Sequence, residues 1–304
     1  MLVPSCRFSN LSFNTNNVPR VNFYTHSAWR LLFCSLLIAL CLPFTSEAAP
    51  SYTVSISGAG SYTSLFNEHL DVVKRSKTEG ISEEEVQRLV AVAPEQVRSL
   101  LATEGYFSPV VSSTLDQEST PWVAHLNIEP GTPTKIEAVD ISFSGDIEAK
   151  NPKRIEQLRE NWGLQPGAIF RQSAWDGAKG DLLKAILNRD YPTASIAHSE
   201  ARIDPATHSA TLTVHVNSGP AFTFGALEIV GLNRYSREMV EKLNPIKPGE
   251  RYSQEKLNEL QARVQDTGYF RSAFATIEAD PAQPNHVPIK LDLTENERRR
   301  LSLG

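Results

Sequence analysis

Apolar and polar residues alternate in short runs that return three times along the chain. Runs that alternate and then end in glycine lie at residues 54–58, 141–145 and 227–231, so their glycines are 87 and 86 residues apart. Strict alternation over such a length is typical of a half-buried β-strand. Three diverged copies of one unit indicate an array of modules, and arrays present surfaces to partners more often than they enclose an active site.

A second mark repeats at nearly the same interval. Gly-Tyr-Phe-Ser, Asp-Tyr-Pro-Thr and Gly-Tyr-Phe-Arg begin at Gly105, Asp190 and Gly268, and each closes a helical pattern and opens a strand pattern. Glycine tolerates the left-handed turn that ends a helix, so Gly105 and Gly268 are predicted to be structural turns. Asp190 stands at this position in the second copy, and aspartate adopts the left-handed conformation less readily than glycine.

Each copy predicts one strand, two helices and then two strands. The first copy predicts Tyr52–Ser57, Ser64–Lys74, a helix from the Ser82/Glu85 capping box to Gly105, Ser108–Leu115 and Val123–Ile128. The second predicts Ile136–Ser144, Pro152–Trp162, Gln172–Asn188, Ala194–Ile203 and Ala210–Val216. The third predicts Phe222–Val230, Arg237–Leu243, Gln254–Thr267, Ala273–Ala279 and Val287–Leu293.

The apolar positions of the copies also correspond. Eight and four residues before each helix-ending turn lie the pairs Val97/Leu101, Leu182/Ile186 and Leu260/Val264, which form one stripe on the second helix. The last strands alternate in the same phase, at Leu126/Ile128, Val214/Val216 and Leu291/Leu293. One buried and one solvated sheet face follow, so we predict an α+β fold of three modules, each a three-stranded sheet with two helices on one face.

Glycine–proline turns divide the copies. Gly131 and Gly219 break the pattern, and we predict modules at residues 49–131, 132–219 and 220–296.

The N-terminus predicts export from the cytoplasm. An apolar run from Leu31 to Phe44 follows Arg30, and small residues Ser46 and Ala48 stand where a signal peptidase requires them. The run is too short to span a bilayer and suits the core of a signal peptide covering residues 1–48. An uncleaved signal anchor is the alternative.

Cysteine content and net charge argue against two kinds of function, thiol chemistry and nucleic-acid binding. Cys6, Cys34 and Cys41 all precede the predicted cleavage site, so the mature chain would contain no thiol, disulfide or cysteine-ligated metal. Cleavage would leave 27 basic and 34 acidic residues, a net charge of −7. An acidic chain argues against nucleic acid as a partner.

Motifs for enzyme chemistry are weak. No histidine pair has the spacing of a helical metal site, and His125 and His215 occupy outward strand positions where we expect solvated side chains. Gly58-Ala59-Gly60 lacks the third glycine of a dinucleotide loop, and Gly177-Ala178-Lys179-Gly180 lacks the spacing of a phosphate loop. The sequence therefore predicts no catalytic residue, no metal site and no cofactor, although a soluble periplasmic enzyme or binding protein stays a remote alternative.

These modules, with their Gly-Tyr-Phe-like and Gly-Pro-like turns, resemble POTRA (polypeptide-transport-associated) domains. Three of them before Arg298-Arg299-Arg300-Leu301-Ser302-Leu303-Gly304 are similar to the TamA family of translocation and assembly module subunits, and residues 93–107 carry the strongest likeness. The resemblance covers residues 52–304. Two related families, the main outer-membrane assembly factors with five modules and the two-partner secretion pores with two, are alternatives that the module count disfavours.

The resemblance implies a non-enzymatic role in outer-membrane protein assembly and autotransporter secretion. In the TamA family an outer-membrane barrel follows the third module, and residues 297–304 are similar to its first strand, so this sequence is expected to lack the rest of that barrel. The implied partners are an inner-membrane-anchored TamB-like subunit, unfolded outer-membrane or autotransporter polypeptides, and the outer membrane itself through the barrel.

A candidate binding strand lies in the first copy. The strand after the helices of such a small sheet is expected at an edge, where unpaired backbone groups accept an added strand. No proline or lysine interrupts Val110–Leu115, so we predict partner binding there, with Val110, Val111 and Leu115 providing apolar contacts.

Overall fold

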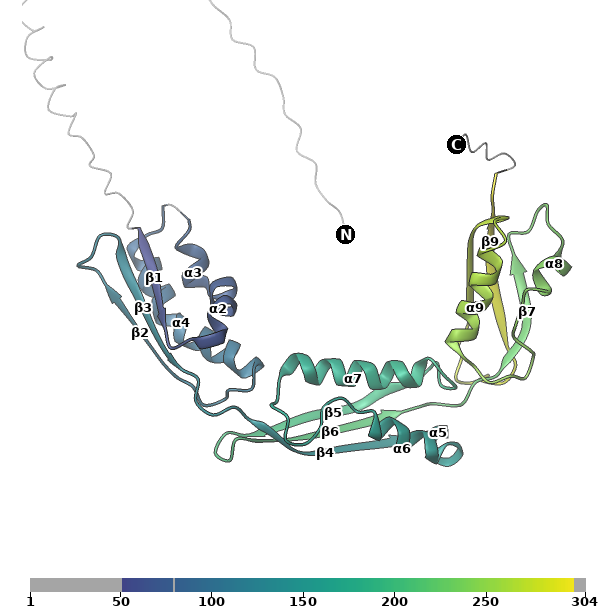
Figure 1. The fold of residues 1–304 in the computed structure, drawn as a ribbon, viewed down its shortest axis with the longest axis horizontal. Helices are drawn as coiled ribbons and strands as arrows, with labels where there is room; N and C mark the ends of the chain where they lie inside the picture. Colours follow the sequence, from purple (N-terminus) through teal and green to yellow (C-terminus); the bar gives the residue numbers. More distant parts are fainter. Residues whose placement is uncertain (1–50, 79, 298–304) are drawn as a thin grey trace, which may run out of the picture. The chain divides into compact units, whose positions relative to one another are not determined.

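The computed structural model describes residues 51–78 and 80–297. The predicted signal peptide (residues 1–48) and nearly all of the predicted barrel start (residues 297–304) lie outside the described residues. Three separate three-stranded sheets, each with its own helices and its own core, form the fold (Figure 1). The predicted α+β array of three modules is confirmed.

The elements follow the predicted order in all three modules. Module 1 contains β1 (Tyr52–Ser57), η1 (Gly60–Tyr62), α2 (Thr63–His69), α3 (Asp71–Arg75), α4 (Glu83–Thr103), β2 (Val110–Asp116) and β3 (Trp122–Glu129). Module 2 contains β4 (Lys135–Ser144), α5 (Asp146–Lys150), α6 (Pro152–Glu160), α7 (Gln172–Leu187), β5 (Ser195–Asp204) and β6 (Ser209–Asn217). Module 3 contains β7 (Phe224–Val230), α8 (Arg237–Glu241), α9 (Gln254–Gln265), β8 (Phe270–Ile277) and β9 (Val287–Glu295).

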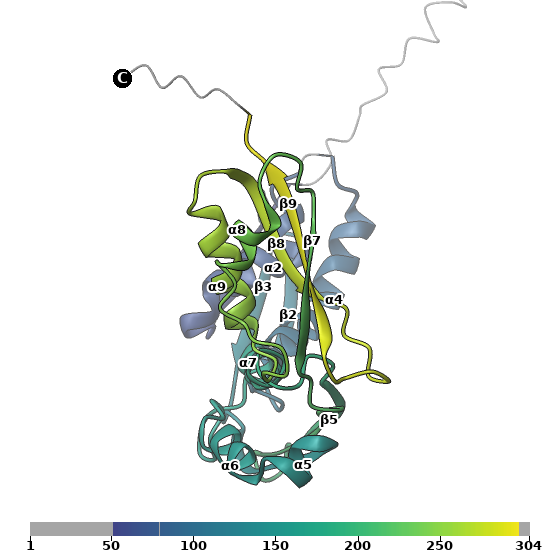
Figure 2. The same cartoon turned by 90° about the vertical axis from the view of Figure 1, so that its right-hand side faces the viewer.

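The last strand of each module lies in the middle of its sheet. The strand orders are β1-β3-β2, β4-β6-β5 and β7-β9-β8, and Figure 2 shows β9 between its two neighbours. The central strand runs parallel to the first strand and antiparallel to the one that precedes it. A parallel pair requires a crossover, and the helices supply it.

The apolar stripe on the second helix is buried in every copy. Leu101, Ile186 and Val264 are each at most 2% exposed and pack on the inner residues of their central strands. Alternate residues of those strands face the open side of the sheet, and the predicted register is therefore confirmed at these positions.

One predicted helix is interrupted, and another is preceded by a short helix that was not predicted. The helix expected over Ser64–Lys74 divides at Leu70, whose extended backbone (ψ 128°) turns its side chain fully into the core. In module 2 a short α5 precedes the predicted helix, and Asn151 (φ −141°) separates the two helices. A residue before proline is disfavoured in the helical region, and Pro152 then fits the first position of α6.

The turns after α4 and α7 form the same hydrogen-bond ladder with the residues that follow each sheet. The carbonyl oxygen of Gly105 accepts from the backbone N–H of Thr134 at 2.8 Å, and that of Asp190 accepts from Phe222 at 2.8 Å. Thr134 in turn accepts from Phe170 at 2.9 Å, and Phe222 from Tyr252 at 3.0 Å. The equivalent carbonyl of Gly268 instead accepts from the Asn296 side chain at 2.6 Å.

Candidate functional site

The predicted binding strand is β2, an edge strand whose outer side has no strand neighbour among the described residues. Val110 is 66% exposed, while Val111 is buried and Leu115 is half-buried against the module 1 core. The Arg98 guanidinium, paired with Glu95 at 3.2 Å, donates to the carbonyl oxygen of Val111 at 3.4 Å. One long side chain therefore partly covers this edge.

Edge position alone does not single out β2. The first strand of each sheet is also an edge strand, as are β5 and β8. In module 2, β5 carries the exposed side chains of His198, Glu200 and Arg202, whereas β2 exposes Val110 and short hydroxyl residues. Charged residues on an edge discourage pairing with an added strand, and β5 exposes more of them than β2 does.

The predicted turn glycines have left-handed backbones. Gly105, Gly131, Gly219 and Gly268 have φ values of +92°, +76°, +61° and +73°, and Asp190 has +69°. A Cβ at Gly105 would overlap the carbonyl oxygen of Phe170, whereas a Cβ at Gly268 would meet nothing within 4 Å. The same motif thus lies in a crowded turn in module 1 and in an open one in module 3.

The two outward histidines differ. His125 is exposed, as expected, but His215 is half-buried because its Nδ1 and Nε2 lie 3.0 and 3.1 Å from the hydroxyl oxygens of Ser142 and Ser144. The expectation of a solvated His215 is therefore wrong, since both serines come from the neighbouring β4 and their contacts depend on its register. Over the described part of the chain, no three histidine, cysteine or acidic side chains gather as a metal site would require.

An ion pair closes the end of module 3. Arg234 binds Glu295 at 2.8 Å, and the backbone N–H groups of Asn233 and Arg234 also donate to its carboxylate. The side-chain hydrogen bond from Arg234, followed by these backbone donors, lowers the pKa of Glu295 to about 2.

In residues 51–78 and 80–297, no helix combines the length and apolar character needed to cross a bilayer.

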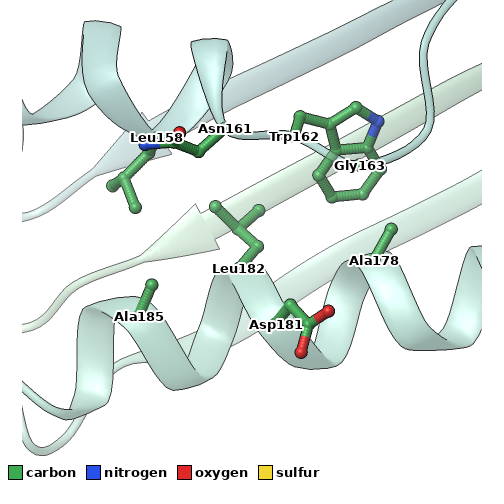
Figure 3. Close-up of a pocket in the computed structure, with 8 residues that line it drawn as sticks. All are labelled: Leu158, Asn161, Trp162, Gly163, Ala178, Asp181, Leu182 and Ala185. Carbon is green, nitrogen blue, oxygen red and sulfur yellow. The ribbon is translucent and has the colours of Figure 1, made fainter.

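A pocket of about 270 Å³ opens between α6 and α7 of module 2 (Figure 3). Its lining is mostly apolar and consists of Leu158, Asn161, Trp162, Gly163, Ala178, Asp181, Leu182 and Ala185. Sequence reasoning missed this pocket. The available signal was the pair of small residues Ala178 and Ala185 on α7, which both line the pocket.

Comparison with known proteins identifies POTRA domains in all three modules. The sequence matches the POTRA family, described as surface antigen variable number repeat, over residues 136–219 and 222–296. Residues 67–130 match the family of the first POTRA domain of TamA.

Individual relatives are more distant. The outer membrane protein assembly factor BamA of Neisseria meningitidis serogroup B (strain ATCC BAA-335 / MC58) is 23% identical over 217 residues, which are 69% of this chain and 26% of the relative. The chain thus spans about a quarter of the length of that relative. POTRA domains 3–5 of Haemophilus influenzae BamA are 16% identical with a TM-score of 0.46, covering 84% of this chain and 100% of theirs. BamA of Haemophilus ducreyi lacking POTRA domains 1–3 is 13% identical with a TM-score of 0.44, covering 53% and 29%. Because the family match covers more than half of the residues, the chain belongs to the POTRA family.

Proposed function

We propose that this chain is the periplasmic scaffold of an outer-membrane protein assembly or autotransporter secretion machine of the TamA type. The observation that carries the proposal is the match of module 1 to the first POTRA domain of TamA, in line with two further POTRA modules. Similarity to an outer membrane protein assembly factor supports the broader class. Its role is to bind polypeptides, and catalysis plays no part in it.

In this proposal the chain is exported and works on the periplasmic face of the outer membrane. Residues 1–48 act as the signal peptide, and an outer-membrane barrel provides the attachment to the membrane. A TamB-like subunit anchored in the inner membrane and unfolded outer-membrane or autotransporter chains are the partners.

Strand addition at β2 is the proposed mode of binding. The Val111 carbonyl oxygen accepts from Arg98 and so points away from β3, and backbone groups alternate along an antiparallel strand. Val111 and Ser113 therefore direct their N–H and C=O groups to the free edge. An incoming strand would displace Arg98, form main-chain hydrogen bonds that demand little of its sequence, and place an apolar residue beside Val110.

Proline at Ser113 tests this mode, because it removes one outward N–H while leaving the bonds to β3. Ser199 in β5 pairs with Val214 as Ser113 pairs with Leu126, so Ser199→Pro is a matched control in module 2. Binding of the purified TamB-like subunit, and of a peptide with the alternating sequence of a barrel strand, is measured by fluorescence anisotropy. Ser113→Pro should weaken both by about five-fold or more, Arg98→Ala should strengthen both, and Ser199→Pro should change neither. Unchanged binding by a folded Ser113→Pro variant would place the contact elsewhere.

A further inference from the structure

The pocket of module 2 has a preformed apolar wall. Leu158, Trp162 and Leu182 are each 5% exposed, so the space lies over side chains that are already fixed. The Trp162 indole donates to the Leu164 carbonyl oxygen at 2.9 Å and meets Trp175 edge to face at 6.1 Å between ring centres. Figure 3 shows Leu182 and Ala178 rising from α7 toward Leu158 and Trp162. An occupant would therefore not have to order this wall.

The volume suits one large side chain. Small-molecule sites usually enclose about 300–1,000 Å³, and this pocket of about 270 Å³ lies below that range. Polypeptides commonly bind by inserting an apolar anchor into such a cavity. The size therefore favours a side chain of another polypeptide over a cofactor or metabolite.

Asp181 adds a charge at the rim. It is exposed, and within the described ranges its carboxylate has no ion pair and no hydrogen bond. Residues at the same helix position in the other modules are engaged: Gln96 bonds Asp71 at 2.6 Å, and Glu259 pairs with Arg263 at 2.6 Å. We propose that this pocket binds a polypeptide segment that inserts one bulky apolar side chain and pairs an adjacent lysine or arginine with Asp181.

Comparison of the three copies shows how the described residues of module 2 differ at this site. Ala185 stands where module 1 has the half-buried Leu100 and where module 3 has Arg263. A small residue beside an unengaged carboxylate thus occurs in module 2 alone among the three. The contact uses side chains of the helical layer and none of the backbone edge of β2, so it is independent of strand addition.

The test uses the full chain labelled with 5-fluorotryptophan, with the Trp162 signal followed by ¹⁹F NMR. The probes are two peptides, acetyl-Gly-Ser-Phe-Lys-Ser-Gly-amide and the same peptide with glutamate in place of lysine. We expect the lysine peptide to shift the Trp162 signal and to bind about five-fold more tightly than the glutamate peptide. Asp181→Lys should reverse this preference, while Glu259→Lys, at the same position in module 3, should leave it unchanged.

Ala185→Leu provides a second variant that fills the pocket with the residue found in module 1. It should abolish the Trp162 shift for both peptides while the far-ultraviolet circular dichroism stays that of the parent. The proposal would be overturned by no shift with the lysine peptide, by equal affinity for the two peptides, or by binding that survives Ala185→Leu. A Trp162 shift that depends on protein concentration without peptide, and that Ala185→Leu removes, would assign the pocket to a second copy of the chain and would also overturn it.

Discussion

Modules 1 and 2 cover their sheets with corresponding helices but treat the space between those helices differently. In module 1, Gln96 of α4 donates to the Asp71 carboxylate at 2.6 Å and accepts from the Asp71 backbone N–H at 3.2 Å. This pair ties α4 to the first turn of α3, and Leu100 lies half-buried one turn farther along. In module 2 the same two positions carry Asp181 and Ala185, and a pocket remains.

The difference shows which positions the fold constrains. Residues that face the sheet, such as Leu101 and Ile186, stay large and apolar because each must fill its core. The neighbouring positions on the second helix face the first helix or the solvent. There the three copies differ: Gln96, Asp181 and Glu259 correspond, as do Leu100, Ala185 and Arg263. Divergence at these positions changes the surface of a module without changing its architecture.

The largest expected effect tests the shared part of this comparison. Leu101→Ala and Ile186→Ala should each lower the free energy of unfolding of their own module by about 2–5 kcal/mol, because both side chains are at most 2% exposed. Tryptophan fluorescence during urea unfolding separates the modules, since Trp122 lies in module 1 and Trp162 and Trp175 lie in module 2. If either variant unfolds at the urea concentration of the parent, the two positions are not equivalent core positions.

Glycine at the helix-ending turn gives the next largest effect. Gly105→Ala should cost about 2–4 kcal/mol, because alanine would have to adopt the left-handed backbone conformation and its Cβ would overlap the Phe170 carbonyl oxygen. Gly268→Ala meets open space and should cost only about 1–2 kcal/mol from the backbone strain. Thermal unfolding by calorimetry compares the two; equal losses would mean that the close approach to Phe170 does not restrict this turn.

The buried stripe and the helix-ending glycines were visible in the sequence, whereas the close approach of the Phe170 carbonyl oxygen to Gly105 was not. The spacing of eight and four residues before each turn identified the buried stripe, since helical and strand periods act locally and are visible in one copy at a time. The break at Leu70 could not be predicted, because the extended residue is held by a core contact and by the Gln96–Asp71 bonds from another helix.

Of the candidate sites, too, some features follow from the sequence and others depend on how the elements pack. The edge position of β2 follows from the order of elements, whereas the cover that Arg98 gives to Val111 depends on how α4 lies over the strand. The pocket is missing volume between two helices, so neither helix predicts it alone. The half-buried environment of His215 similarly depends on the register of β4 against β6, which brings the Ser142 and Ser144 hydroxyls to its ring.

Exchanging the residues at positions 100 and 185 should open space in module 1 and fill the pocket of module 2. Leu100→Ala removes a half-buried side chain from module 1 and should lower its stability by about 1–2 kcal/mol. Ala185→Leu adds the same side chain at the rim of an existing cavity and should leave module 2 within about 0.5 kcal/mol of the parent or slightly more stable. Urea unfolding followed by tryptophan fluorescence measures both. A strongly destabilised Ala185→Leu variant would mean that no space exists at this position.

The smallest expected effect concerns the two hydrogen bonds between Gln96 and Asp71, which form a bridge between α4 and α3. Gln96→Ala removes two hydrogen bonds between α3 and α4 and should cost about 1 kcal/mol, a modest value because these hydrogen bonds are exposed and water replaces them. Asp181→Ala, at the same position in module 2, removes no hydrogen bond or ion pair formed within the described residues and should stay within about 0.5 kcal/mol of the parent. Hydrogen exchange at Val72 and Val73 provides a local readout, since faster exchange there would mark loosening of α3 in the Gln96→Ala variant alone. If the two substitutions have the same effect on stability and exchange, the bridge does not hold the helices of module 1 together, and the closed and open helix pairs differ only in side-chain volume.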